Sequence, residues 1–228
     1  MTRSRTLRAS AAAVLAGLLL SACSAHPGSA AVVGPVQIGT AEVDDVATAL
    51  CSAQSSGNAG GQQQDLASRA ARQGALDVLI SSELSRLFGR SQGVEPDQEQ
   101  VSQALAANEA NINGLPASER AVFRDTLQKF AEGQLMLVEI GRRSLAESGA
   151  KNVTDQQALS EGTKLRNAWV SKHVDVSVDP RFGEFSKGSL VGKSGSLSVP
   201  VSQRAADGDS PDPSAGWVAA LPASQKCS

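Results

Sequence analysis

The sequence predicts a mainly α-helical domain of about five helices, closed by a small two-stranded β element and followed by an irregular C-terminal extension. Apolar residues recur at helical spacing in five stretches between residues 41 and 169. Residues 173–180 instead alternate between polar and apolar side chains, which is typical of a half-buried strand. Aromatic residues make up 3% of the chain, so we expect a core of Leu, Val, Ile and Ala.

Residues 1–22 are typical of a bacterial signal peptide. Three arginines precede a run of ten apolar residues, which is shorter than the roughly 20 residues that span a membrane. The motif LSAC, which ends at Cys23, resembles the lipobox, whose cysteine receives a diacylglycerol and becomes the new N-terminus. We therefore expect a lipid anchor at Cys23 that holds the protein on the extracytoplasmic face of the cell membrane. The alternative is an ordinary cleaved signal with a chance cysteine.

The charge balance excludes some partners. Removal of residues 1–22, which hold three arginines and no acidic residue, takes the formal net charge from −2 to −5. Nucleic acid is therefore not expected, because its binding depends on clustered Lys and Arg. The glycine-rich stretch 57–61 lacks the Gly-Lys-Ser/Thr of a phosphate-binding loop, so no nucleotide is expected either.

Two further cysteines, Cys51 and Cys227, remain once Cys23 is assigned to the lipid. Disulfides persist in the oxidising extracytoplasmic compartment, and two thiols allow one pairing. We expect a Cys51–Cys227 disulfide that ties the end of the chain to the first helix. The alternative is two unpaired thiols.

The domain is predicted to begin with a strand and to end with one. Residues 23–31 are small and polar and form the expected tether to the lipid. Residues 32–38 are expected to form a strand with a turn inside it, and Pro35 places that strand at an edge or in a hairpin. Its expected partner is the stretch 173–180, because a lone strand leaves its backbone groups unpaired. The pairing would close a domain that spans residues 32–182.

Three helices are predicted in the first half of this domain. The first begins near Ala41, behind a Thr40 cap. The second covers residues 65–88 and carries a continuous apolar face. The third begins after Asp97, which fits a helix cap with Gln100, and includes Ile112.

Two more helices follow. The fourth is expected to run from a Ser118 cap to about Ser148, with Gly149 as its stop. Within it, Gly133 and Gly141 predict a bend or the close approach of a neighbouring helix. The fifth begins at Thr154, which forms a capping box with Gln157. This cap explains Thr154 better than the glycosylation sequon that it completes.

The C-terminal extension, residues 183–228, is rich in Gly, Ser, Asp and Pro. We expect residues 183–214 to be mostly irregular. Residues 216–221 carry enough apolar side chains to dock back onto the domain, next to the cysteine that anchors the end of the chain.

Three segments resemble the N-terminal chaperone module of SurA-type and PrsA-type foldases. Residues 72–84 (RQGALDVLISSEL) match its L-x-x-L-I-x-x-x-L helix, and residues 93–97 (GVEPD), followed by Val101, match its turn into a second helix. Residues 174–183 (VDVSVDPRFG) resemble the strand that ends the module in lipoprotein members. The resemblance covers roughly residues 32–185 and implies a chaperone for secreted or cell-envelope proteins.

The chain departs from complete members of that family in one respect. They carry a parvulin-type prolyl isomerase domain of about 90 residues after the module, whereas 45 residues follow Gly183 here. That domain uses two histidines near a Cys or Asp, but the histidines of this chain are His26, in the tether, and His173. The resemblance therefore implies a chaperone module without isomerase activity, and we expect no enzyme.

No catalytic or metal site is expected elsewhere. We expect His173 to be a surface residue at a helix-to-strand junction rather than a general base or a ligand. Neither G-x-S-x-G nor H-E-x-x-H occurs. Metal sites need three or four convergent ligands, which two histidines and two bridged cysteines do not provide, so no cofactor is expected.

An apolar groove between the helices is the expected binding site, because unfolded chains bind through non-directional burial of apolar surface. Its expected lining residues are apolar positions of the second, third and fourth helices: Leu84, Leu87, Phe88, Val101, Leu105, Phe123, Leu127 and Phe130.

The function that these observations favour is a lipid-anchored, ATP-independent chaperone that holds unfolded or nascent secreted polypeptides. The competing class is a structural lipoprotein that binds one dedicated envelope partner through the same helical surface. An unrecognised isomerase is a third, weaker alternative.

Overall fold

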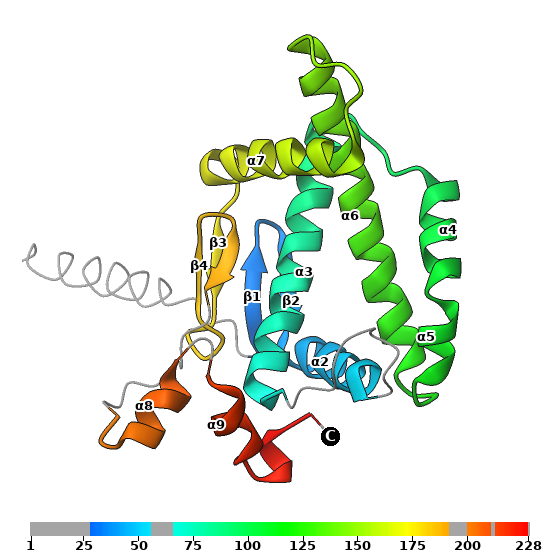
Figure 1. Ribbon diagram of the computed structural model, residues 1–228. Helices are drawn as coiled ribbons and strands as arrows, with labels where there is room; N and C mark the ends of the chain where they lie inside the picture. The colour runs from blue at the N-terminus through cyan, green and yellow to red at the C-terminus, as the bar shows by residue number, and fades with distance from the viewer. Residues whose placement is uncertain (1–27, 56–65, 192–199, 211–212, 228) are drawn as a thin grey trace, which may run out of the picture.

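The computed structural model describes residues 28–55, 66–191, 200–210 and 213–227 (Figure 1). Within them the protein is mainly helical, which confirms the predicted fold class. The helices are α2 (Thr40–Ser55), α3 (Ser68–Ser91), α4 (Gln98–Ala107), α5 (Glu109–Gly114), α6 (Arg120–Glu147), α7 (Asp155–His173), α8 (Gln203–Asp209), α9 (Ala215–Ala219) and the 3-10 helix η2 (Ala223–Gln225). The strands are β1 (Ser29–Val33), β2 (Val36–Gly39), β3 (Val176–Val178), β4 (Glu184–Ser186) and β5 (Ser189–Val191). The expected signal peptide and Cys23 lie outside the described residues.

The predicted pairing of the first and last strands is confirmed, but the sheet has three strands instead of two. β1 lies between β2 and β3 and pairs antiparallel with both. Gly34, at φ +53°, and Pro35 form the turn that folds β1 and β2 into a hairpin. β1 also begins at Ser29 rather than at residue 32, so the last three residues of the expected tether belong to the domain.

Local hydrogen bonds set the start of two helices as the sequence predicts. The Asp97 carboxylate accepts from the backbone amides of Glu99 and Gln100 at the start of α4. The capping box of Thr154 and Gln157 is present at the start of α7. These caps satisfy amide groups that have no partner within the helix.

The third and fourth predicted helices differ from the structure. The third is two helices, α4 and α5, which meet at Asn108, whose side-chain amide donates to the carbonyl oxygen of Ala104 at 2.8 Å. This side-chain bond competes with the helical pattern and favours the break. Ser118 does not cap the fourth helix, because α6 begins two residues later, at Arg120, behind an N-cap residue that makes no side-chain cap bond.

Helices α3 and α6 lie side by side and form the centre of the domain (Figure 1). α2 crosses the lower end of this pair in the view of Figure 1, α7 crosses its upper part, and the small sheet lies against α3. α4 and α5 flank the other side of α6. The connection between α6 and α7 therefore lies at one end of the domain, and the start of α3 lies at the other.

Glycines allow α6 and α7 to approach closely. A Cβ atom built on Gly141 of α6 would overlap the carbonyl oxygen of Ala158, and one on Gly162 of α7 would overlap the carbonyl oxygen of Leu137. The close approach predicted for the fourth helix is therefore confirmed at Gly141. At Gly133, a Cβ would lie 2.9 Å from the Ser85 Cβ, so small residues also bring α3 and α6 together.

The core consists of three clusters. The largest joins the sheet, α2 and α3 and is centred on Leu76, Ile80 and Leu84, all fully buried. The second joins the upper part of α3 and α6 to α7 around Phe88 and Leu137. The third, at the lower end, joins α2, α5 and α6 around Ile112, Leu115 and Phe123.

The C-terminal extension is more regular than predicted. Residues 184–191 form the β4–β5 hairpin, whose turn residues Lys187 and Gly188 have φ of +52° and +88°. A Lys-Gly turn with two positive φ angles matches the twist of a tight antiparallel hairpin. Further on, the Trp217 indole N–H donates to the carbonyl oxygen of Arg204 at 2.8 Å and so joins α9 to α8.

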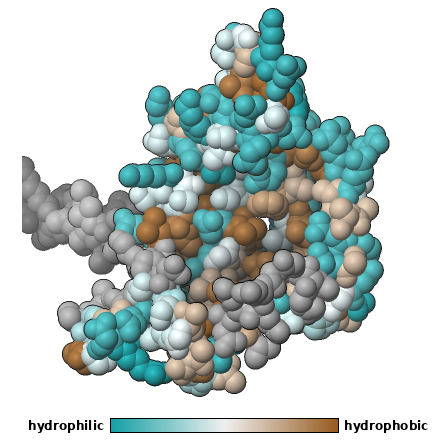
Figure 2. Space-filling view, viewed as in Figure 1, coloured by the Kyte–Doolittle hydropathy of each residue, from teal (hydrophilic) through white to brown (hydrophobic). Residues whose placement is uncertain are grey.

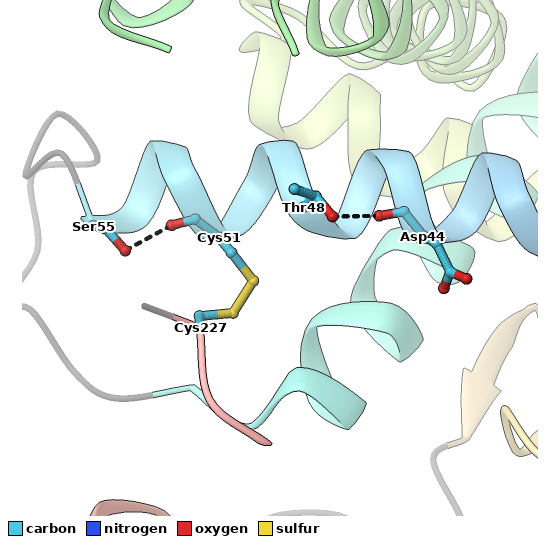
Figure 3. Close-up of a disulfide and its surroundings, with 5 residues drawn as sticks. All are labelled: Asp44, Thr48, Cys51, Ser55 and Cys227. Carbon is cyan, nitrogen blue, oxygen red and sulfur yellow. Dashed lines mark hydrogen bonds between the residues drawn. A yellow bond between two sulfur atoms is a disulfide. The ribbon is translucent and has the colours of Figure 1, made fainter. Parts of the chain in front are cut away.

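Cys51 on α2 forms a disulfide with Cys227 (Figure 3). The two Cα atoms lie 5.0 Å apart, although 176 positions separate the residues in sequence. The Cys227 amide also donates to the Leu66 carbonyl oxygen at 2.8 Å, and Lys226 forms a β-bridge with Ala67. The end of the chain is therefore fastened both to α2 and to the start of α3.

Candidate functional site

The eight residues predicted to line a groove do not form one open surface. Four of them are buried in the core: Leu84, Phe88, Val101 and Phe123. Leu87, Leu105 and Leu127 are half-buried, and Phe130, on α6, is exposed. Leu84 and Phe88 of α3 are covered by α2, α6 and α7, Phe123 of α6 packs against α2 and α5, and Val101 of α4 is also buried. The structure therefore does not leave these four side chains open to a client.

A cavity of about 430 Å³ lies at the end of the domain where α6 connects to α7. We call it the tip pocket. Its apolar lining comes from Leu145 on α6 and from Ala150 and Val153 in the connecting loop. The remaining lining residues are polar and come from the loop and the first turns of α7: Lys151, Gln156, Gln157, Ser160 and Glu161.

Local sequence signals shape the loop that borders the tip pocket. Gly149 ends α6 at φ +85°, as its position predicts, and the Ala150 amide donates to the Leu145 carbonyl oxygen at 3.0 Å. Asn152 also has a positive φ, +56°, which asparagine tolerates better than most residues. The capping box at Thr154 then starts α7. The loop therefore turns back sharply and leaves Val153 half-buried beside the end of α6.

One ion pair and one hydrogen bond join α6 to α7 near the tip pocket. The Arg142 guanidinium on α6 bonds the Asp155 carboxylate on α7, with an N–O distance of 2.5 Å. Glu161 accepts from the Ser144 hydroxyl at 3.4 Å and from Lys164 at 3.2 Å. The tip pocket thus combines three apolar with five polar lining residues, and its volume lies in the range of 300–1,000 Å³ that is common for ligand pockets.

Exposed apolar side chains are otherwise few. Among the described residues, the large hydrophobic side chains that are exposed are Phe130, Val191 and Val201. Figure 2 shows hydrophobic residues in the middle of one face, with hydrophilic residues around them, and a further hydrophobic spot near the α6–α7 connection. The described surface thus offers an apolar area of limited size.

A buried arginine holds the β4–β5 hairpin in place. Arg166 of α7 is 6% exposed and donates to the Ser85 hydroxyl on α3 at 3.1 Å and to the Gly188 carbonyl oxygen at 3.4 Å. Burial lowers the pKa of Arg166, and the charge of Asp77 opposes this shift. Asp77 in turn accepts from the Leu190 amide at 2.9 Å. This network fastens the extension to the helices and gives the guanidinium a structural role.

Of the two histidines considered for catalysis or metal binding, the structure describes His173. His173 is the last residue of α7 and stacks on Trp169, with ring centroids 5.4 Å apart. In the part of the chain that the structure describes, no group of three or more His, Cys, Asp or Glu side chains is placed to hold a metal ion. Likewise, none of the described helices is long and apolar enough to cross a membrane.

Sequence reasoning missed both the tip pocket and Arg166. The tip pocket forms where two helix ends and a loop meet. The caps that shape this loop can be predicted from the sequence, but the cavity cannot. Nothing in the sequence distinguishes Arg166 from the exposed arginines of neighbouring helices. Comparisons with protein-family models, with curated proteins and with solved structures find no match for this chain, so its function must be argued from its own residues.

Proposed function

We propose that this protein is an extracytoplasmic lipoprotein, anchored through a diacylglycerol on Cys23, that binds unfolded or nascent secreted polypeptides without catalysis or ATP. The lipobox-like motif and the resemblance of residues 72–84 and 174–183 to the SurA-type chaperone module support this proposal. The observation that carries it is the tip pocket, which combines apolar side chains with polar ones that can bond a peptide backbone.

The tip pocket suits a short extended stretch of polypeptide. Leu145, Ala150 and Val153 would take one apolar side chain, and Gln156 and Ser160, which also line the pocket, are polar side chains that can bond a peptide backbone. Burial of one Leu or Val side chain contributes about 1.5–3 kcal/mol, whereas micromolar binding needs about 8 kcal/mol. A single pocket therefore holds a client weakly and reversibly, and a lipid anchor would compensate by concentrating the protein where clients emerge.

The small apolar area of the described surface favours a second candidate function. Four of the eight expected groove residues are buried, and three large hydrophobic side chains are exposed among the described residues. Binding of many unrelated unfolded chains depends on non-directional burial of apolar surface, so few exposed apolar side chains favour a narrower range of partners. A structural lipoprotein that binds one dedicated envelope partner through the tip pocket accounts for the same surface.

An aggregation assay separates the two functions. The mature chain without lipid, residues 24–228 with the Cys51–Cys227 disulfide formed, is added at stoichiometric ratio to two unrelated, chemically unfolded proteins. The variant Leu145→Ser/Val153→Ser replaces two of the three apolar residues that line the tip pocket. Val191→Ser, on the exposed β5 strand, is the matched control.

Suppression of both aggregation reactions by the wild type and by Val191→Ser, with at least a threefold loss for Leu145→Ser/Val153→Ser, is the expected result. If a folded wild type suppresses neither reaction, the general chaperone is excluded. Crosslinking at the tip on intact membranes then tests the dedicated partner, which predicts one strong product that the same double variant abolishes.

A further inference from the structure

Three arginines surround a small cavity of about 40 Å³ at the lower end of the domain. We call it the arginine pocket. Arg69 and Arg72 lie on the first turns of α3, and Arg181 follows β3. Gln73 and the ring of Phe182 complete the lining. The cavity has room for about three water-sized groups, which is the size of the oxygen face of one phosphate.

The protein itself orients two of these guanidinium groups. The Arg72 guanidinium carbon lies 5.2 Å from the centroid of the buried Phe182 ring, and its Nε donates to Asp44 at 2.6 Å. Arg181 makes a forked pair with Asp179, at 3.0 Å from Nε and 2.6 Å from Nη2. The planar faces of these groups are therefore held in place before any ligand arrives, which lowers the entropy lost on binding.

Donors remain available to an anion in the arginine pocket. Each guanidinium carries five N–H groups, and the contacts with Asp44 and Asp179 use one and two of them. Arg69 donates from Nη2 to the Ser210 carbonyl oxygen at 3.0 Å, which leaves its charge unneutralised by that contact. Among the described side chains, the arginine pocket therefore has three guanidinium groups and two carboxylates paired with them, one from Asp44 and one from Asp179. A tetrahedral oxyanion matches the excess positive charge and the remaining donors.

The position of the arginine pocket connects it to the membrane. The Asp179 amide donates to the Ala30 carbonyl oxygen at 2.9 Å, so the pocket lies beside the start of β1. Ser29, the first residue of β1, follows Cys23 by six positions. Six residues span at most about 20 Å, so an anchor at Cys23 would keep the pocket within that distance of the lipid headgroups.

We propose that the arginine pocket binds the phosphate of a phospholipid headgroup and thereby sets the orientation of the domain on the membrane. The proposal rests on the anchor at Cys23 that the proposed function includes. The tip pocket lies at the opposite end of the α3–α6 pair (Figure 1). Phosphate binding at the lower end directs the tip pocket away from the bilayer, toward emerging polypeptides. The mature chain has a formal charge of −5, so no net attraction to an anionic surface is expected, and the variants below separate site binding from the local charge of the arginines.

The test uses residues 23–228 coupled to a nanodisc through Cys23. Cys51 and Cys227 form a disulfide, so the remaining cysteine, Cys23, can be attached selectively to a maleimide lipid. All the contacts described above lie within residues 28–227, which this chain retains. A gadolinium-chelating lipid then broadens the NMR signals of amides near the bilayer. In the wild type we expect at least fivefold stronger relaxation at residues 181–183 than at residues 150–153.

Two double variants with the same change in charge separate site binding from general electrostatics. Arg69→Gln/Arg181→Gln should abolish the difference between the two ends of the domain. Arg142→Gln/Arg143→Gln, which removes the same number of positive charges at the end of α6, should preserve it. If the first variant does not fold, Arg69→Lys/Arg181→Lys keeps the charge without the planar fork and should reduce the difference at least twofold.

A titration with inorganic phosphate distinguishes the two sources of the anion. In the uncoupled chain, phosphate should shift the Nε–H signals of Arg69, Arg72 and Arg181. If phosphate shifts them but the coupled chain has no preferred orientation, the site takes free phosphate and the headgroup proposal is wrong. An orientation that persists in Arg69→Gln/Arg181→Gln also overturns it. Chemical coupling at Cys23 makes these results independent of cellular lipidation and of the aggregation assay.

Discussion

The Arg166 guanidinium of α7 donates a 3.1 Å hydrogen bond to the Ser85 hydroxyl of α3 inside the protein, although 81 positions separate the two residues. The Ser85 hydroxyl also donates a hydrogen bond to the Ser81 carbonyl oxygen at 2.7 Å, so it is held as both donor and acceptor. The same guanidinium reaches the turn of the β4–β5 hairpin. One side chain thus links α3, α7 and the C-terminal extension.

We expect Arg166→Ala to destabilise the protein by about 2–4 kcal/mol, because it leaves a cavity and removes donors from buried acceptors. Chemical unfolding followed by circular dichroism measures the change. Lys164→Ala, on the same helix with a largely exposed side chain, should alter stability by less than about 0.5 kcal/mol. Equal stability of the two variants would contradict the structural role of Arg166.

Gly162→Ala should destabilise the protein by about 1–3 kcal/mol, because the new methyl group overlaps the Leu137 carbonyl oxygen and forces α6 and α7 apart. Gly74→Ala is the matched control, since no atom lies within 4 Å of a Cβ at that position of α3. There alanine should stabilise by up to about 1 kcal/mol through its helix propensity. Thermal unfolding should therefore shift in opposite directions, and a shift of the same sign would disprove the close contact.

Loss of the disulfide should free the end of the chain. Cys51→Ser/Cys227→Ser should lower stability by up to about 5 kcal/mol in the chain-entropy model, since the bridge closes a loop of 176 positions. Carboxypeptidase should also remove residues 223–227 faster. A reducing agent should reproduce both effects in the wild type and should change nothing in the double variant. Unchanged digestion would show that the backbone contacts to Leu66 and Ala67 suffice.

Acid should weaken the start of α4. The backbone amide and the side chain of Gln100 donate to the Asp97 carboxylate and hold its pKa below the usual value. A lowered pKa in the folded state means that this stabilisation is complete above the unfolded pKa, near 4, and is lost as the pH falls through the folded value. Asparagine also caps helices, so Asp97→Asn should be nearly as stable as the wild type at pH 7.

Amide exchange of residues 99–103 at pH 7 and at pH 3 measures this dependence. The wild type should lose protection at pH 3, and Asp97→Asn should lose less of it. An identical loss in both proteins would place the acid sensitivity elsewhere, for example at Asp179, whose pKa the side-chain hydrogen bond from Arg181 also lowers.

Features that depend on neighbouring residues or on simple pairing could be predicted from the amino-acid sequence. The caps at Asp97 and Thr154 are hydrogen bonds across two or three positions, so sequence spacing is enough to identify them. The stretch before Pro180, in which polar and apolar residues alternate, predicted a strand that needs a hydrogen-bonding partner, and the structure pairs it with the first strand. The cysteine count left Cys51 a single partner once Cys23 was assigned to the lipid.

The tertiary structure decided which apolar and charged side chains face inward. Phe123 and Phe130 share one helical stripe in the sequence, yet packing against α2 and α5 buries the first and leaves the second exposed. Arg166 is buried and Arg181 is exposed, although nothing in their local sequence separates them. The arginine pocket joins positions 72 and 181, and the tip pocket forms where two helix ends meet. Such placements depend on contacts between distant segments, which local spacing does not encode.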